Sequence, residues 1–278
     1  MDKVFTIERN QMLVSLNGDP ANPPVLLIHG WGSHRGVWRQ TIAALQTRYY
    51  CVAPDLLGFG ASDKPANADY SVLAQGQRIL KLADQLELST FSIIGHSFGG
   101  QIALYIAATQ APRRVDKLVS VAGVITGRLS DRVEKLIVPF VSLARRFPGL
   151  YGLARAWLNI PGIAGWEFGH WFYDMNSIPF EAWEADRNAA LNPASAIALD
   201  ETAKAIHALN MSKYVHKVKA PVLLISGEDD DTVPVDQATL AQAGISNNQL
   251  AIIKKCGHFP MYEKTSQYLR ALALIFPN

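Results

Sequence analysis

Short, continuous apolar runs recur along this chain and constrain its fold more than any other feature. Runs with almost no polar residues are typical of strands covered on both faces, and they occur at residues 25–28, 49–53, 91–94, 118–121, 222–225 and 250–253. Segments with helical spacing of apolar residues separate most of them, at 36–46, 70–87 and 99–110. Strands that alternate with helices need crossover connections, which predicts an α/β fold with a mostly parallel sheet and helices on both faces.

Two more strands are expected before the first run. Residues 4–8 and 12–16 alternate apolar and polar side chains, and the turn signal Asn17-Gly18 follows them. This period of two is the pattern of an antiparallel hairpin. With the six apolar runs, the hairpin brings the expected sheet to eight strands.

One interval interrupts the alternation of strands and helices. Between the runs at 118–121 and 222–225 no buried strand is indicated, and the spacing with its Pro and Gly punctuation predicts helices at 131–146, 150–158, 165–173, 179–191 and 193–209. A helical insertion in an α/β domain is most simply a cap over the carboxyl edge of the sheet, where such sheets bind ligands. We therefore expect a core domain of residues 1–126 and 211–278 and a helical cap of residues 127–210.

Composition excludes several classes of protein. The chain of 278 residues is 49% hydrophobic and can bury a large core, while a net charge of +2 without a long basic tract argues against a nucleic-acid partner. Cys51 and Cys256 are too few for a disulfide framework. The start, MDKVFTIERNQ, lacks the apolar stretch of a signal peptide, and no apolar run is long enough to span a membrane. We expect a cytoplasmic protein, monomeric or homodimeric.

A serine between glycines supplies the first chemical signal. Gly95-His96-Ser97-Phe98-Gly99 follows the run at 91–94 and precedes a helical segment. The Gly-x-Ser-x-Gly pattern alone is weak, but a strand-to-helix turn forces the serine into a strained conformation, and only small residues two positions away let strand and helix pass. Its hydroxyl then projects at the carboxyl edge, near the positive end of the helix. Ser97 is thus a candidate nucleophile.

A serine nucleophile needs a base, and the chain offers seven histidines. His258 is the best placed, because it follows the last apolar run and so belongs to a loop at the same edge as Ser97. His96 is adjacent to Ser97, but we expect its side chain to point elsewhere. His29 lies in a loop at the end of a strand, and the others lie in loops or in the helical insertion.

The acid that orients this base should come from another loop at that edge. Glu228, Asp229, Asp230 and Asp231 follow the run at 222–225, and this pattern alone leaves the choice among them open. No acid follows the run at 118–121 at a comparable distance. The order serine, acid, histidine is that of α/β-hydrolase triads.

At this point the chain resembles the α/β-hydrolase superfamily, in its capped, esterase-like branch, over nearly its whole length. The resemblance is carried by His29-Gly30-Trp31-Gly32, Asp55-Leu56-Leu57-Gly58-Phe59-Gly60-Ala61-Ser62, Gly-His-Ser-Phe-Gly-Gly, Gly227-x-x-Asp230-x-x-Val233-Pro234 and Gly257-His258. It implies that Asp230 is the acid and that the backbone amides of Trp31 and Phe98 form the oxyanion hole. Leu57 departs from the proline of many relatives, in a loop that is mainly structural.

The predicted reaction is hydrolysis of a small-molecule carboxylic ester through an acyl-enzyme on Ser97, with His258 as base and acid and Asp230 as its partner. No cluster of ligand residues has metal spacing, so neither metal nor cofactor is expected. Relatives with an aspartate nucleophile are disfavoured by Ser97. Meta-cleavage carbon–carbon hydrolases, which often carry Asn where this chain has His96, stay open as alternatives. So do perhydrolases, acyltransferases and small-molecule receptors that retain the triad.

The predicted cap is rich in aromatic residues, which suggests an apolar substrate pocket, although such side chains more often form a helical module's own core. Pocket residues are predicted at His29, Trp157, Trp171, Trp183 and Phe259. A weaker hypothesis is that residues 168–173 contact lipid. The sequence leaves the length of the acyl chain open.

Overall fold

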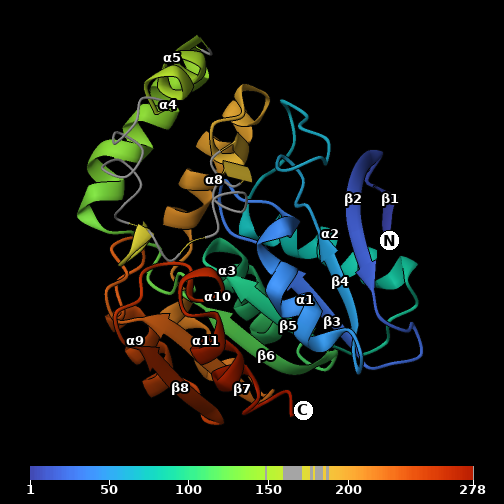
Figure 1. The fold of residues 1–278 in the computed structure, drawn as a ribbon. Coiled ribbons are helices and arrows are strands. Elements are labelled where there is room, and N and C mark those ends of the chain that lie inside the picture. Colours follow the sequence, from blue (N-terminus) through green and yellow to red (C-terminus); the bar gives the residue numbers. More distant parts are fainter. Residues whose placement is uncertain (148, 159–170, 176–177, 179–183, 186–187, 278) are drawn as a thin grey trace.

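In the computed structural model, the apolar runs and the hairpin form one sheet of eight strands in the order β1-β2-β4-β3-β5-β6-β7-β8 (Figure 1). The structure describes the chain except residues 148, 159–170, 176–177, 179–183, 186–187 and 278. Neighbouring strands from β4 to β8 in this order are parallel. Strand β2 is antiparallel to both of its neighbours, β1 and β4. The predicted α/β class and the eight strands are confirmed.

The elements that were predicted and that lie within the described residues begin and end close to the expected residues. The strands are β1 Asp2–Ile7, β2 Asn10–Asn17, β3 Pro24–Ile28, β4 Tyr50–Pro54, β5 Phe91–His96, β6 Val115–Val121, β7 Val222–Gly227 and β8 Asn248–Ile253. The α-helices are α1 Arg39–Leu45, α2 Val72–Gln85, α3 Phe98–Tyr105, α4 Val138–Arg146, α5 Gly149–Leu158, α8 Ala196–Ala208, α9 Asp236–Gly244, α10 Pro260–Glu263 and α11 Thr265–Leu272. Single 3-10 or π turns are η1 Arg35–Trp38, η2 Ile106–Gln110, η3 Val133–Ile137, η6 Pro193–Ser195, η7 Met211–Lys213 and η8 Val215–Lys217.

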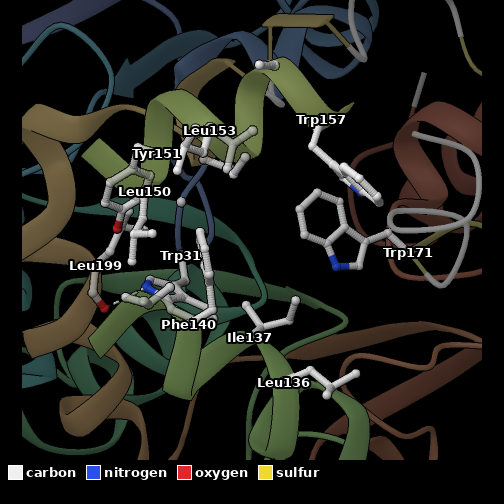
Figure 2. A pocket seen from close by; sticks show the side chains of 16 residues that line it. Trp31, Leu136, Ile137, Phe140, Leu150, Tyr151, Leu153, Trp157, Trp171 and Leu199 are labelled. Atoms are coloured by element: carbon white, nitrogen blue, oxygen red, sulfur yellow. Dashed lines mark hydrogen bonds between the residues drawn. The ribbon is translucent and has the colours of Figure 1, made fainter. Parts of the chain in front are cut away.

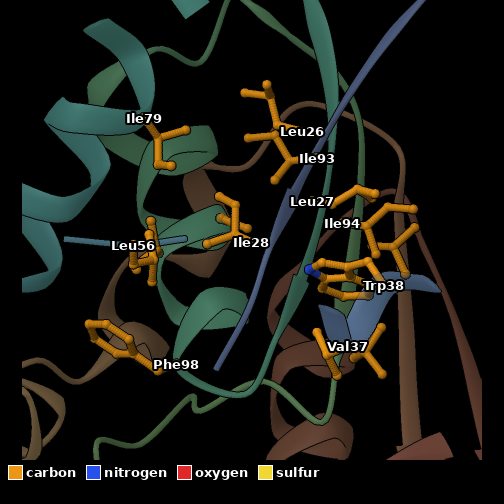
Figure 3. Close-up of a cluster of buried hydrophobic side chains, with 14 of the residues drawn as sticks. Leu26, Leu27, Ile28, Val37, Trp38, Leu56, Ile79, Ile93, Ile94 and Phe98 are labelled. Atoms are coloured by element: carbon orange, nitrogen blue, oxygen red, sulfur yellow. The ribbon is translucent and has the colours of Figure 1, made fainter. Parts of the chain in front are cut away.

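The central strands are apolar on both sides because helices cover both faces of the sheet. Helices α1 and α11 contact each other on one face, and α2 and α3 contact each other on the other. Figure 3 shows the consequence in β3: Ile28 points toward Ile79 of α2, whereas Leu27 points toward Trp38. All four side chains are fully buried. In β2, by contrast, Met12, Val14 and Leu16 are buried and alternate with partly exposed residues, as predicted for a hairpin.

Three helices of the predicted insertion lie above the sheet in Figure 1: α4, α5 and α8. Asp200 of α8 is almost fully buried; it accepts a hydrogen bond from Ser142 (2.5 Å) and forms an ion pair with Arg145 of α4 (2.6 Å). Leu199 of α8 accepts a hydrogen bond from the indole of Trp31, which follows β3, so α8 lies over the carboxyl edge of the sheet. The helices expected at 165–173 and 179–191 fall mostly outside the described residues.

Neither membrane spans nor metal clusters are found in the part of the chain that the structure describes. None of its helices is both long and apolar enough to cross a bilayer. No group of three or more His, Cys, Asp or Glu side chains there is arranged to hold a metal ion. Cys51 and Cys256 are buried and unbridged.

Candidate active site

Ser97 occupies the sharp turn between β5 and α3. Its backbone has φ 53° and ψ −116°, a strained conformation for a residue with a side chain. The flanking glycines are required by close backbone approach: a Cβ on Gly95 would lie 2.2 Å from the carbonyl oxygen of Gly99, and one on Gly99 would lie 2.1 Å from that of Ile28. The turn therefore has the geometry expected from the sequence.

Two backbone amides accompany this serine. Phe98 is the first residue of α3, so its amide is one of those that a helix leaves without an internal partner. Trp31 lies in the loop after β3, and Gly30 of that loop is so close that a Cβ there would lie 3.1 Å from the Cβ of Ser97. Neither the Phe98 nor the Trp31 amide donates to any residue that the structure describes. Both are available as donors to a bound oxyanion.

His258 and Asp230 form a buried hydrogen-bonded pair. His258 Nδ1 lies 2.8 Å from Oδ2 of Asp230, and the side chains are 5% and 0% exposed. The other carboxylate oxygen, Oδ1, accepts from the amides of Thr232 and Val233, both at 2.9 Å. Three donors thus fix the Asp230 carboxylate, which leaves it able to hold the imidazole with Nδ1 protonated.

The other acids of this loop are not placed for that role. Glu228, Asp229 and Asp231 are exposed, whereas Asp230 is buried. The Asp229 amide donates to Cys256 and the Asp231 carbonyl accepts from Ser130, so their backbones, rather than their carboxylates, hold the loop.

Glu263 holds the backbone around His258, a feature that the sequence analysis missed. Its Oε2 accepts from the Gly257 amide (2.7 Å) and its Oε1 from the Asp174 amide (2.6 Å). The His258 amide itself donates to the carbonyl of Trp171 at 2.7 Å. Burial raises the pKa of Glu263, while the two amide bonds act against that shift. The signal in the sequence was a lone carboxylate five residues after the candidate base.

The expectation that the His96 side chain points away from the site is wrong. Its Nε2 donates to the carbonyl oxygen of His258 at 2.8 Å, and its ring centroid lies 4.7 Å from those of His258 and Phe259. Burial, and then the neighbouring His258, hold the pKa of His96 well below its usual value. A neutral imidazole therefore packs beside His258 and fixes its backbone.

His29, predicted as a pocket residue, is instead structural. It is fully buried, its Nδ1 donates to the carbonyl of Gly30 (2.8 Å) and its Nε2 accepts from the amide of Leu56 (2.9 Å). The ring thus joins the loop after β3 to the loop after β4 and lines neither cavity described below. Burial lowers its pKa to about 4.

Two adjacent cavities lie over the carboxyl edge. The smaller one, about 50 Å³, is lined by Ser97, His258, His96 and Phe259, among others, and we call it the serine pocket. The larger, about 850 Å³, lies between η3, α4, α5 and α8, and we call it the apolar chamber (Figure 2). Of the remaining predicted pocket residues, Trp171 lines both cavities, Trp157 lines the chamber, and Trp183 lies outside the described residues.

Comparison with known sequences places this chain in a family. A family model described as the alpha/beta hydrolase family matches residues 25–271. An uncharacterised protein of Mycobacterium tuberculosis is 31% identical over 255 residues, which are 90% of this chain and 74% of that protein. The 2-hydroxy-6-oxo-2,4-heptadienoate hydrolase of Pseudomonas putida is 26% identical (90% and 87% covered). The pimeloyl-[acyl-carrier protein] methyl ester esterase of Nitrosomonas europaea is also 26% identical (89% and 93%).

Solved structures share the fold over the whole chain. An esterase from Exiguobacterium antarcticum superposes with a TM-score of 0.82 at 19% identity and covers 100% of both chains. A 2-hydroxy-6-oxo-6-phenylhexa-2,4-dienoate hydrolase from a Rhodococcus strain superposes with a TM-score of 0.80 at 23% identity and covers 100% of this chain and 99% of its own. At these identities the likeness concerns the fold alone.

Proposed function

The chain belongs to the α/β-hydrolase family, and from that premise we propose that it is a serine hydrolase that cleaves carboxylic esters. The observation that carries the proposal is the buried Asp230–His258 pair, whose imidazole lines the same small pocket as Ser97 on its strained turn. A hydrogen-bonded acid and imidazole beside a serine at the carboxyl edge of the sheet are the parts that acyl transfer needs.

In the proposed first step, Nε2 of His258 accepts the proton of the Ser97 hydroxyl while Oγ attacks the ester carbonyl. Asp230 keeps the Nδ1 proton in place and stabilises the imidazolium that forms. His258 then gives its proton to the leaving alkoxide, which departs as the alcohol and leaves an acyl-enzyme. Water then attacks this intermediate while His258 accepts its proton; His258 returns that proton to Ser97, the carboxylic acid is released and free Ser97 is regenerated.

The amides of Trp31 and Phe98 are the proposed oxyanion donors. Each has no acceptor among the described residues, and the Phe98 amide lies at the positive end of α3, where negative charge is stabilised. One such donor is typically worth about 3–4 kcal/mol in the transition state. We further propose that residues 127–210 act as a cap that covers the site, because α8 contacts Trp31 directly.

The dienoate hydrolases among the relatives favour a second candidate, cleavage of a carbon–carbon bond. A dienoate carries a carboxylate, which needs a cation or donors when it leaves water. The residues that the structure describes as lining the two cavities include no Lys or Arg, and their hydroxyl donors, such as Ser33 and Thr232, are neutral. This lining fits a neutral ester better.

The test is turnover of p-nitrophenyl acetate by the full chain and by Ser97→Ala, with Ser120→Ala as the control. Ser120 is a buried serine at the end of neighbouring β6 and lines neither cavity. Ser97→Ala should lose at least about 10³-fold in kcat, as in other triads, while Ser120→Ala stays near wild type. Near wild-type turnover by Ser97→Ala would contradict the proposal.

Two further readouts separate the alternatives. Release of one equivalent of p-nitrophenol followed by a stable adduct would indicate a receptor, whereas many turnovers indicate an enzyme. Faster hydrolysis of a 2-hydroxy-6-oxo-dienoate than of any ester would select the carbon–carbon hydrolase instead.

A further inference from the structure

The apolar chamber is much larger than the serine pocket and has a different chemical character. Its volume is about 850 Å³, against about 50 Å³ for the pocket that contains Ser97. None of the described residues that line the chamber carries a charged side chain; Phe140, Leu150, Leu153 and Trp157 are typical of them (Figure 2). Cavities of 300–1,000 Å³ with apolar walls are those that bind small organic ligands.

The two cavities meet at residues that line both, chiefly Trp31, Ile137 and Trp171. The Trp31 indole donates a hydrogen bond to the Leu199 carbonyl of α8 (2.9 Å), which holds the ring where it lines both cavities. The carbonyl of Trp171 accepts the hydrogen bond of the His258 amide. A group bound in the chamber therefore lies next to the pocket that contains the proposed base and nucleophile, His258 and Ser97.

The serine pocket has room for little more than the reacting group, so the bulk of a substrate must lie elsewhere. A charged group in the chamber would lose its hydration without a charged partner among the described lining residues. An extended hydrocarbon chain gains from burial at every methylene.

We infer that the apolar chamber binds an extended, uncharged hydrocarbon chain of the ester substrate, with the carbonyl held beside Ser97. This inference rests on the proposed ester hydrolysis and adds the substrate class. The hydrocarbon chain can belong to the acyl or to the alcohol part of the ester, since either arrangement would place the ester carbonyl at Ser97.

The kinetic test is two ester series: p-nitrophenyl esters from acetate to decanoate, and acetates of alkanols from ethanol to octanol, all below their solubility limits. In the series whose chain enters the chamber, kcat/KM should rise about fourfold per methylene, the value for burial of one methylene group, until the chamber is filled. The series that shows the rise identifies the part of the ester. No dependence on length in either series overturns the inference.

Matched variants on α5 show where the chain binds. Ala154 lines the chamber, whereas Gly152 lines neither cavity and has open space where a Cβ would lie. Ala154→Trp should lower kcat/KM for long-chain esters far more than for the acetyl ester, so that the gain with chain length is lost. Gly152→Trp should keep the wild-type profile. An equal loss at all lengths in Ala154→Trp would contradict a chain-binding chamber.

A binding measurement separates this inference from the reaction itself. Trp31, Trp157 and Trp171 line the chamber, so 1-octanol should shift the tryptophan emission of Ser97→Ala at concentrations where 1-butanol does not. Such a shift, together with no ester turnover by the wild-type protein, would support binding in the chamber and contradict the proposed hydrolase activity. Ester turnover with no shift and no dependence on length would do the reverse.

Discussion

The Asp230→Asn substitution tests the proposed mechanism at the residue that the sequence pattern alone left ambiguous. Oδ1 of Asp230 accepts two backbone amides, and an Asn oxygen can keep both bonds. The Asn NH₂ would then face Nδ1 of His258, where Oδ2 now lies at 2.8 Å. Nδ1 must become an acceptor, so the proton moves to Nε2 and the imidazole can no longer take the proton of Ser97.

The expected loss in kcat is about 10⁴-fold, the value for the same change in another serine triad. That ratio corresponds to about 5.4 kcal/mol of transition-state stabilisation. A hydrogen bond to a charged group accounts for roughly 1.5–3 kcal/mol of this, and the wrong tautomer supplies the rest. Because the two amide bonds survive, the melting temperature should change little.

The assay is hydrolysis of p-nitrophenyl butyrate at neutral pH, with Asp229→Asn and Asp231→Asn as matched controls. Both control side chains are exposed, and their backbone bonds do not involve the carboxylates. The controls should stay within about twofold of wild type. A loss below tenfold in Asp230→Asn, or equal losses in all three variants, would refute the assignment of Asp230.

Two other predictions concern stability. The pKa of His29 is about 4 in the folded chain, below its unfolded value near 6.5, so the unfolded state binds more protons at acidic pH. Titration of His29 should not change the free energy of unfolding above pH 6.5, and should lower it by up to about 3 kcal/mol as the pH drops toward 4. Urea titrations over this pH range should show a smaller fall for His29→Gln than for the wild type. Glu263→Gln turns an NH₂ toward either the Gly257 or the Asp174 amide, so at neutral pH it should lower the free energy of unfolding by about 1–3 kcal/mol. An unchanged urea midpoint would show that these two bonds are dispensable.

The fold was predictable because burial on both faces leaves a mark in the sequence. A strand such as β3 has no polar face, since Ile28 meets α2 on one side and Leu27 meets Trp38 on the other. Helical spacing likewise predicted α2 and α8 to within a few residues. Both the apolar runs and the helical spacing are periodic patterns of apolar residues, and such patterns are read from the sequence without knowledge of tertiary contacts.

The site was predictable only where backbone geometry dictated it. Ser97 is fixed by the approach of strand and helix, which the glycines record. His96 is the last residue of β5 and His29 follows β3 directly, but the direction of a side chain at the end of a strand depends on contacts with distant segments. The partner of His96 is the His258 carbonyl, 162 positions away, and His29 accepts from Leu56. No local pattern contains that information, and both side-chain predictions were therefore wrong.

The proposed chemistry and the proposed specificity depend on different parts of the structure. Ser97, Asp230 and His258 follow β5, β7 and β8, so the parallel sheet brings them together whatever covers it. The chamber walls come mainly from the helices above, which are joined by the buried Asp200 and its partners on α4. Substitutions in α4 or α5 should therefore change which ester is cleaved and leave the reaction itself intact. The same fold occurs in solved proteins named as an esterase and as a dienoate hydrolase, as expected where the reaction depends on the site rather than on the fold.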